Sequence, residues 1–554
     1  MKDRMAIVSR WRPRIEPGMF VILLLWFGIG VNPGSAAGAV PLPDIALNHG
    51  RVIDPETGLD AIRHLGITDG EITQVSETPL EAVRIIDVSG HIVAPGFIDT
   101  HTHGAVTPHG GKLSLRNGVT TAMDLEAGAM NIARWYDERD GKWQLNYGTT
   151  VSQEFARAVV LDGFDPVSLR DMRDLFATRA ASQGQGKSRW STGIATADEL
   201  NSILGLLDEG LREGAIGIGS LLGYAAAGIT SREMYETQRV AANYGRLTAV
   251  HQRYFENAPP KENSIAAAEV MNNAFVLDAP LLYVHFNIDN WPLVQELMVG
   301  ARARGMNVWG EVYPYTSGST NVGANFLDPD KWKATVGAIE TTVYDPQLGR
   351  FITEDELVGF RTEEPGRTII GFIRPEAWVV PWLRLPGVVV AGDGMLPTDA
   401  DGQLLAWEDA YELGAYHPRT SGTQAKALRL AREHRIPWPH MIRILSYNSA
   451  KYLGDAGIEA MRRRGRLQVG MVADITVFDP ATVTDRSSFD LGRNGIPPDG
   501  IPLVVVNGVV VVDKARVLEG VFPGQPIRFA PESDGRFQPL ALDGDWVLEA
   551  KHPH

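Results

Sequence analysis

The chain has 554 residues, enough to bury a large core in two or more domains, and its 44% apolar content excludes an intrinsically disordered protein. The formal net charge of −15 comes from acids spread along the whole chain, which argues against nucleic acid or an anionic membrane as partner. The absence of cysteine excludes thiolate metal ligands and a nucleophilic cysteine.

Residues 1–39 have the three parts of a secretory signal peptide. Five Lys and Arg residues stand among the first fourteen, an apolar run follows from Met19 to Val31, and small residues from Gly34 to Ala39 offer an Ala-x-Ala cleavage site. The run is shorter than the roughly 20 residues that a membrane span needs. We therefore expect cleavage after Ala39, export to the periplasm of a bacterium, and no stable membrane association of the mature chain.

Two segments near the ends of the mature chain are rich in short β-strand signals. Residues 44–92 and 463–530 contain apolar runs bounded by Gly, Asp or Ser, such as Arg84–Val88 and Pro502–Val512. Because these segments flank a long middle part with a different sequence pattern, we predict that they form one small composite β-sandwich. Residues 531–554 are expected to be a C-terminal tail.

The middle of the chain, residues 93–462, alternates between strand-like and helical patterns. Apolar runs such as Leu247–Val250 and Leu281–Val284 are separated by amphipathic stretches such as Asn201–Leu211. Such alternation indicates a parallel sheet with crossover helices, and its length favours a closed barrel. We predict an α/β fold, a (β/α)8 TIM-like barrel. Residues 317–370 interrupt the alternation with Pro, Gly and acidic residues.

The first barrel strand ends in a pair of histidines. Residues 93–104 read Val-Ala-Pro-Gly-Phe-Ile-Asp-Thr-His-Thr-His-Gly, so His101 and His103 follow an apolar run directly. Side chains at i and i+2 of an extended chain point the same way, so both imidazoles can reach one divalent metal, and imidazole suits zinc. Barrel enzymes have their sites at this end of the strands.

Two more histidines close later strands of the predicted barrel. His251 ends the run Leu247–Val250, and His285 ends the run Leu281–Val284. One histidine in such a place is usually structural. Two of them, on successive strands after a His-x-His pair, are expected to be ligands of a second metal position.

Three cationic residues are candidates for binding a substrate carboxylate. Arg419 follows His417-Pro418, and its planar guanidinium can grip a carboxylate with two parallel hydrogen bonds. Arg253 and Lys261 are possible partners of a second carboxylate. For these two residues, a solvated surface charge is the competing interpretation.

Taken together, these motifs resemble the amidohydrolase superfamily, and within it the N-acyl-D-amino-acid deacylases (D-aminoacylases). The resemblance runs from about Ile45 to Arg528. It rests on the order and spacing of residues 95–103 and of six further segments: Gly118-Val-Thr-Thr121, His251-Gln-Arg253, Val284-His285, Tyr313-Pro-Tyr-Thr316, Gly392-Asp393-Gly394 and His417-Pro-Arg419.

The resemblance implies a metal-dependent hydrolysis of N-acyl-D-amino acids, small-molecule substrates, with one or two Zn²⁺ ions. It implies Asp393 as the general acid and base, Tyr313 or Tyr315 as a hydrogen-bond donor to the substrate, and the insertion at about 317–370 as a lid. An Asp-Gly after a strand is otherwise often only a turn.

The ligand that bridges two metals departs from the family pattern. Well-known D-aminoacylases use a Cys shortly after Gly-Val-Thr-Thr and most of the superfamily uses a carboxylated Lys, but residues 118–128 contain neither. Glu126 lies one place before the aligned position of the Cys and is the first candidate, with Asp124 second. A carboxylate can bridge two such cations. A surface acid that caps the next helix is the competing interpretation.

Other reactions at the same site remain open. The fold does not distinguish the deacylase from a dipeptidase, a cyclic-amide hydrolase or a lactonase. A barrel that binds metal without turnover is the alternative from another class. No Gly-x-Ser-x-Gly elbow occurs, which argues against a serine hydrolase of that type.

Overall fold

The computed structural model describes residues 42–541 with the exception of residues 187, 255–256 and 259–260. The predicted signal peptide and residues 542–554 of the predicted tail therefore lie outside the described residues. Among the described helices, none combines the length and the apolar character that crossing a bilayer requires.

Eight parallel strands form the central sheet, as the alternating pattern predicts. Neighbouring strands are hydrogen-bonded in the order β19, β14, β13, β10, β9, β8, β7, β6. Their bounds are β6 Phe97–Asp99, β7 Val119–Ala129, β8 Asn146–Ser152, β9 Gly217–Ser220, β10 Leu247–Val250, β13 Leu281–Tyr283, β14 Val308–Val312 and β19 Val389–Val390. The predicted TIM-like barrel is thereby confirmed.

The barrel closes between its first and last strands just beyond their C-terminal ends. The backbone N–H of Asp393 donates to the carbonyl of His101 at 2.6 Å, and Gly104 donates to Gly394 at 2.9 Å. The buried carboxylate of Asp99 accepts from the N–H of Gly392 at 3.0 Å. The loops that carry the candidate site residues are therefore also the seam of the barrel.

Apolar side chains fill the centre of the barrel. One buried cluster draws on β6, β7, β10, β13, β14 and β19, and it includes Ile98, Leu125, Ala249, Leu282, Trp309 and Val389. Because strands from opposite sides of the barrel contribute to it, this cluster is a packed core.

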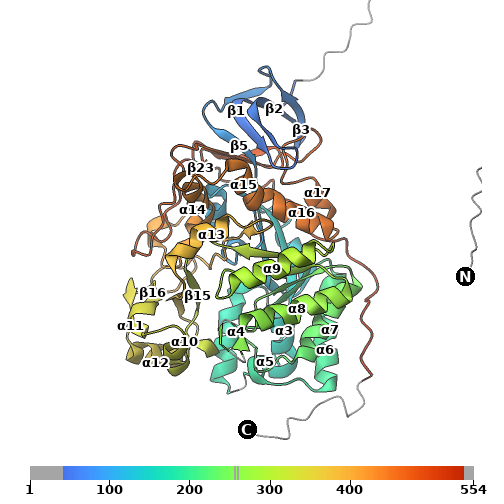
Figure 1. Cartoon of the computed structure of the whole chain (residues 1–554), viewed down its shortest axis with the longest axis vertical. Coiled ribbons are helices and arrows are strands. Elements are labelled where there is room, and N and C mark those ends of the chain that lie inside the picture. The colour runs from blue at the N-terminus through green and yellow to red at the C-terminus, as the bar shows by residue number, and fades with distance from the viewer. Residues whose placement is uncertain (1–41, 187, 255–256, 259–260, 542–554) are drawn as a thin grey trace, which may run out of the picture. The chain divides into compact units, whose positions relative to one another are not determined.

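Helices cover the outside of the barrel. In α6, Thr196 and Glu199 form a capping box, and Leu200, Ile203 and Leu207 give it a buried face at helical spacing. Figure 1 shows α6, α7, α8 and α9 side by side over the strands. The helices are α1 Pro108–Arg116, α2 Ile132–Asp137, α3 Gln153–Arg157, α4 Met172–Gly184, α5 Arg189–Thr192, α6 Ala197–Arg212, α7 Ser231–Asn243, α8 Asn263–Leu277, α9 Trp291–Arg302, α13 Val379–Leu383, α14 Arg419–Glu433, α15 Trp438–Ile442, α16 Asn448–Asp455 and α17 Glu459–Arg462.

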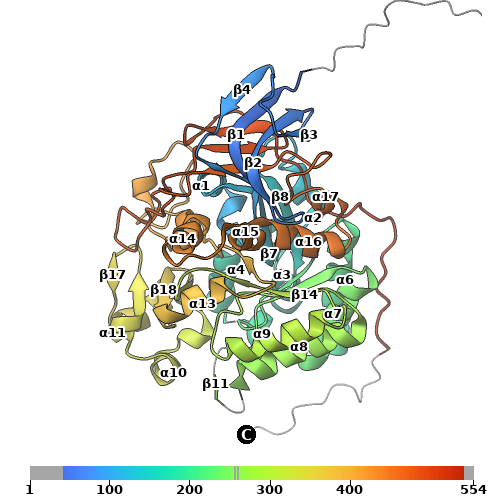
Figure 2. The same ribbon diagram turned by 45° about the horizontal axis from the view of Figure 1, so that its top comes forward.

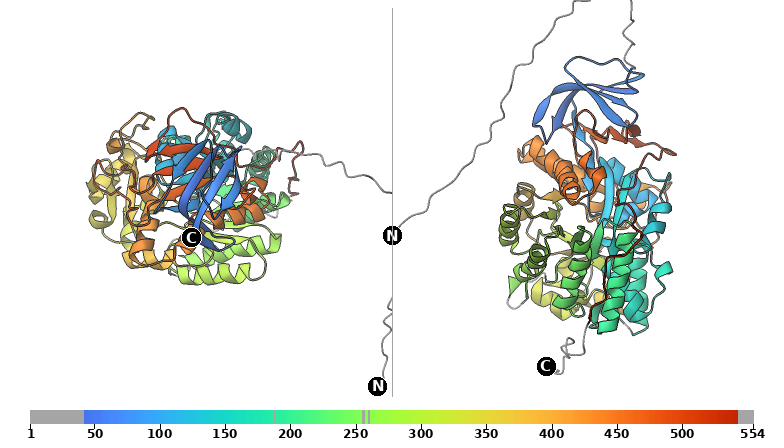
Figure 3. Two further views of the ribbon diagram at one scale, coloured as in Figure 1. Left: turned by 90° about the horizontal axis from the view of Figure 1, so that it is seen from above. Right: turned by 90° about the vertical axis from the view of Figure 1, so that its right-hand side faces the viewer.

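The N- and C-terminal segments build a second sheet together. Strand β5 pairs antiparallel with β20, with Pro95 opposite Ile475, so strands from the two segments lie side by side (Figure 3). Ile72 and Val510, from opposite ends of the sheet, share one apolar cluster, so the sheet curls around its own core. Its strands are β1 Ile45–Asp54, β2 Leu59–Thr68, β3 Glu71–Ser76, β4 Arg84–Asp87, β5 Ile92–Pro95, β20 Ile475–Phe478, β21 Leu503–Val506, β22 Val509–Asp513 and β23 Arg516–Val517.

Each of the two segments of this module ends at a different residue from the predicted one. Residues 93–95 belong to β5 rather than to the barrel, which begins at Phe97. After β23 the chain leaves the module and runs along the barrel, where Ile527 donates to the carbonyl of Tyr147 at 2.7 Å. Apolar runs alone do not reveal which sheet a strand will join.

The insertion within the barrel is a subdomain with its own sheet and core. Strands β15, β18, β16 and β17 pair antiparallel in that order, and Leu327, Trp332 and Ile369 are among the residues of its buried cluster. Its elements lie together in Figure 2: β15 Ser317–Asn321, α10 Pro329–Thr335, α11 Ile339–Thr342, β16 Val343–Asp345, β17 Arg350–Phe351, α12 Glu354–Glu363 and β18 Thr368–Phe372. A short hairpin, β11 Asn257–Ala258 and β12 Lys261–Glu262, precedes α8.

A buried aspartate ties the terminal module to the barrel. Asp474, just before β20, accepts from Arg464 at 2.9 Å and from the side chain of Asn146 in β8 at 2.9 Å. The N–H of Asn507, in the turn between β21 and β22, donates to its other oxygen at 2.7 Å.

Replacing this aspartate should destabilise the whole chain. Asp474→Ala leaves the buried guanidinium of Arg464 without its carboxylate, which lowers the free energy of unfolding by about 3–5 kcal/mol. Asp513→Ala removes an exposed ion pair with Arg84 and should cost less than about 1 kcal/mol. Denaturant unfolding of both variants checks this, and equal losses would contradict the structural role of Asp474.

Candidate metal centre

Six residues predicted as metal ligands or acid–base catalyst meet at the C-terminal ends of the barrel strands. His101 and His103 follow β6, Glu126 lies in β7, and His251, His285 and Asp393 follow β10, β13 and β19. All six side chains are buried. Their convergence from five strands explains why they are far apart in the sequence.

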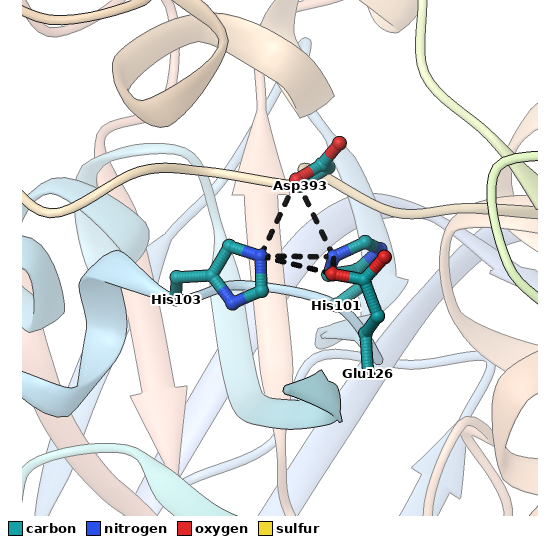
Figure 4. Close-up of side chains that lie close together, drawn as sticks. All are labelled: His101, His103, Glu126 and Asp393. Carbon is teal, nitrogen blue, oxygen red and sulfur yellow. Dashed lines mark hydrogen bonds and ion pairs between the residues drawn. The ribbon is translucent and has the colours of Figure 1, made fainter. Parts of the chain in front are cut away.

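The first group gathers around one oxygen of Glu126 (Figure 4). Glu126 Oε2 lies 3.1 Å from His101 Nε2 and 3.3 Å from His103 Nε2. Asp393 Oδ1 lies 3.3 Å from the same atom of His101 and 3.5 Å from that of His103. Four potential ligand atoms therefore face a single point.

The second group gathers around the other oxygen. Glu126 Oε1 lies 2.6 Å from His251 Nδ1 and 3.2 Å from His285 Nε2. The two imidazole nitrogens are 3.0 Å apart. Glu126 thus belongs to both groups, with one oxygen directed to each.

These separations fit zinc. Ligand atoms bound tetrahedrally to Zn²⁺ at about 2.0–2.1 Å lie about 3.4 Å from one another. Most of the pairs described above fall close to that value. Imidazole nitrogen and carboxylate oxygen are ligands that zinc accepts, and a carboxylate can span two ions.

The backbone is bent and strained where it presents these side chains. The pairing of β7 with β8 shifts register between Asp124 and Ala129, across the position of Glu126. His285 and Asp393 have φ angles of 28° and 46°, uncommon for residues other than glycine. Strain of this kind is typical of residues held in place for function.

Further carboxylates hold the imidazole rings from behind. Glu311 Oε1, in β14, contacts His101 Nδ1 at 2.5 Å, and Asp124 Oδ2 contacts His103 Nδ1 at 2.8 Å. Such contacts fix which ring nitrogen faces a metal. Asp124 thus supports His103 and does not lie between the two groups, unlike Glu126. Sequence reasoning missed Glu311, although a single acid inside the apolar run Val308–Val312 was a usable signal.

The charges of the site are mutually dependent. Burial alone would lower the pKa values of His101 and His103, but neighbouring carboxylates outweigh it and raise both well above the ordinary value. Burial would raise the pKa of Glu126, but His101 and the other histidines hold that pKa well below its ordinary value. Burial lowers the pKa of His251 to about 4. A metal ion would therefore have to displace protons from His101 and His103.

Asp393 is paired with Arg419, the first residue of α14. Arg419 Nη2 lies 2.9 Å from Asp393 Oδ2, and the arginine side chain is fully buried. Burial would raise the pKa of Asp393, but Arg419 and the histidines outweigh it and hold the pKa below its ordinary value. The guanidinium carbon lies 4.8 Å from the ring centre of Tyr313, whose own centre is 6.3 Å from that of His285.

Three other predicted residues lie elsewhere or are already engaged. Tyr315 turns toward α14, where Lys426 Nζ lies 3.9 Å from its ring centre. Arg253 is not a solvated charge, because its guanidinium is buried and makes two 2.8 Å hydrogen bonds to Glu269, so it is already paired with a carboxylate. Lys261 is exposed.

Curated relatives cover almost the whole chain, although no protein-family model matches it. D-aminoacylase of Alcaligenes xylosoxydans xylosoxydans is 27% identical over 517 residues, which cover 84% of this chain and 94% of that protein. N-acyl-D-glutamate deacylase of the same organism is 26% identical, with 85% and 94% covered.

Solved structures of such enzymes share the fold. N-acyl-D-glutamate deacylase from Bordetella bronchiseptica, in complex with zinc and a phosphonate inhibitor, superimposes with a TM-score of 0.67 at 22% identity, covering 88% of this chain and all of that one. A D-hydantoinase gives a TM-score of 0.53 at 18% identity. The first likeness extends to the terminal module as well as the barrel, because it covers nearly the whole described chain.

Loss of a supporting carboxylate should weaken metal binding without unfolding the barrel. Glu311→Gln keeps the shape of the side chain but not its charge, so zinc affinity should fall by about 10- to 100-fold. Titration with a competing chelator measures this. Glu364→Gln, at an exposed carboxylate outside the site, is the control and should bind zinc as the wild type does.

Proposed function

We infer that this chain is a metal-dependent amidohydrolase, and we propose that it hydrolyses the amide bond of N-acyl-D-amino acids, releasing a carboxylic acid and a D-amino acid. The carrying observation is Glu126, which offers one oxygen to each of two histidine pairs, with Asp393 and Arg419 at the same point. Similarity to D-aminoacylase over 84% of the chain supports the reaction.

His101, His103, Glu126, His251 and His285 would hold one or two zinc ions, and their donor atoms fit that ion. Bound there, zinc supplies a Lewis acid that polarises a carbonyl group and makes water nucleophilic at neutral pH. Glu311 and Asp124 keep the rings of His101 and His103 oriented.

Asp393 is our candidate for the proton transfers. Its lowered pKa keeps the carboxylate ionised, so it can accept the proton of the attacking water. The same carboxyl group then donates that proton to the nitrogen of the leaving amine. Asp393 Oδ1 lies 3.3 Å from His101 Nε2 and 3.5 Å from His103 Nε2, so this oxygen is placed to exchange the proton beside the histidines.

Arg419 is our candidate for binding the substrate's α-carboxylate. Its side chain is fully buried, and Nη2 is the nitrogen nearest to Asp393, whereas Nε and Nη1 have no hydrogen-bond partner among the described residues. The remaining N–H groups suit a planar carboxylate. Tyr313, whose ring packs against the same guanidinium, is favoured over Tyr315 as the accompanying hydrogen-bond donor.

We propose that the insertion subdomain acts as a lid over this site. Two contacts connect it to residues around the metal centre. Ser317 Oγ lies 2.8 Å from His417 Nε2, next to Arg419, and Thr320 Oγ1 lies 2.9 Å from the hydroxyl of Tyr224. The Tyr224 ring centre is 5.0 Å from that of His251.

The decisive experiment is an assay with paired enantiomers. The zinc-loaded mature chain should hydrolyse N-acetyl-D-amino acids and leave the L-forms intact. Asp393→Asn should lower kcat by about 100-fold or more, because it loses the proton acceptor. Metal content, measured on the same samples, should stay unchanged.

Other outcomes identify the competing reactions. Hydrolysis of dipeptides, cyclic amides or lactones, with no action on N-acetyl-D-amino acids, would replace the deacylase proposal by another reaction of the same site. Zinc bound without hydrolysis of any of these substrates would favour a non-catalytic metal-binding barrel.

We also propose that the protein is exported to the bacterial periplasm. The support is the pattern of residues 1–39, with its basic, apolar and small-residue parts. Protein recovered from the periplasm of an expressing bacterium should begin at Val40, as measured by N-terminal sequencing. Full-length protein retained in the cytoplasm would contradict export.

A further inference from the structure

Two guanidinium groups contact Tyr313, and among the described residues only that of Arg419 is paired with an acid. Arg419 packs against the ring and forms an ion pair with Asp393. Arg374 Nη1 donates to the hydroxyl of Tyr313 at 3.1 Å. The hydrogen-bond partner of Arg374 is thus a phenol hydroxyl and not a carboxylate.

Arg374 stands where the insertion subdomain rejoins the barrel. It follows β18, and the N–H of its neighbour Ile373 donates to the carbonyl of Thr316 at 3.3 Å. Gly318, in β15, is close to the same phenol, since a Cβ there would lie 3.9 Å from the hydroxyl oxygen. The guanidinium therefore lies beside a site residue, at the base of the subdomain.

The positive charge of Arg374 is half-buried and not neutralised by an ion pair. Among the described residues, no carboxylate lies within 4.0 Å of its guanidinium. Asp289 is close enough for Arg374 to favour its ionised form, although burial, the larger effect, raises the pKa of Asp289. A partly desolvated guanidinium without a carboxylate is unfavourable, and a ligand's carboxylate would satisfy it.

We propose that Arg374 binds a second carboxylate of the substrate, so that the preferred substrates are N-acyl-D-amino acids with two negative charges. This inference rests on the proposed function, in which Arg419 takes the α-carboxylate. Tyr313 contacts both guanidinium groups, that of Arg419 with its ring and that of Arg374 with its hydroxyl, so a dianionic substrate bound beside Tyr313 can engage both arginines. The second carboxylate belongs either to an acidic side chain, as in D-glutamate, or to a dicarboxylic acyl group, as in a succinyl amide.

The test compares substrates of nearly equal shape. For the wild type, kcat/KM should be higher for N-acetyl-D-glutamate than for N-acetyl-D-glutamine. Arg374→Gln should reduce that ratio by roughly 10- to 100-fold, because it removes a charge-assisted hydrogen bond. Arg374→Lys keeps the charge and should retain part of the preference. The matched control is Arg384→Gln, at an exposed arginine that bonds only a backbone carbonyl, and it should leave the ratio unchanged.

A second pair of substrates distinguishes the two sources of the carboxylate. If the acyl group carries it, N-succinyl-D-leucine should be preferred to N-acetyl-D-leucine, and Arg374→Gln should abolish that preference. If neither preference changes in Arg374→Gln, the inference is wrong.

Binding separates this inference from the proposed reaction. In zinc-loaded Asp393→Asn, calorimetry should show tighter binding of N-acetyl-D-glutamate or N-succinyl-D-leucine than of the counterpart with a single carboxylate, and the added Arg374→Gln should remove the difference. Discrimination in binding without hydrolysis by the wild type would support the role of Arg374 and overturn the deacylase reaction. Hydrolysis by the wild type, without any discrimination in binding, would support the deacylase reaction and overturn the role of Arg374. Equal binding of all four compounds would overturn the inference.

Discussion

The architecture of the site depends on one buried carboxylate that two pairs of imidazoles share. A buried anion is costly unless opposite charges or hydrogen-bond donors surround it. Glu126 meets that condition because each of its oxygens faces two histidines. The same arrangement keeps two cation positions next to each other, which neither histidine pair would do alone.

The fold holds this arrangement from several directions. Asp99 accepts from Gly392 at the seam of the barrel, so the strand bearing the first histidines and the segment bearing Asp393 are joined. Glu311 and Asp124 fix the rings of His101 and His103. The strained φ angles of His285 and Asp393 persist because neighbouring contacts determine the positions of these residues.

Much of this site could be predicted from the sequence, because its residues follow apolar strands whose C-terminal ends must meet. His101, His103, His251, His285 and Asp393 all stand in such places, whereas Arg419 is the first residue of α14. The roles of Glu311 and Asp124 depend on which ring nitrogen they face, which no spacing reveals. Arg253 pairs with Glu269 of α8, and the ring of Tyr315 packs against Lys426 of α14; both contacts depend on tertiary packing. The division of strands between the two sheets also depends on long-range pairing.

The most direct test of the shared carboxylate is a crystal structure of the zinc-loaded protein with anomalous scattering recorded at the zinc absorption edge. We predict that every zinc peak in the barrel lies within about 2.0–2.2 Å of an oxygen of Glu126. One ion would select one oxygen, and two ions would use both. Zinc bound by the histidines with Glu126 turned away would contradict the account.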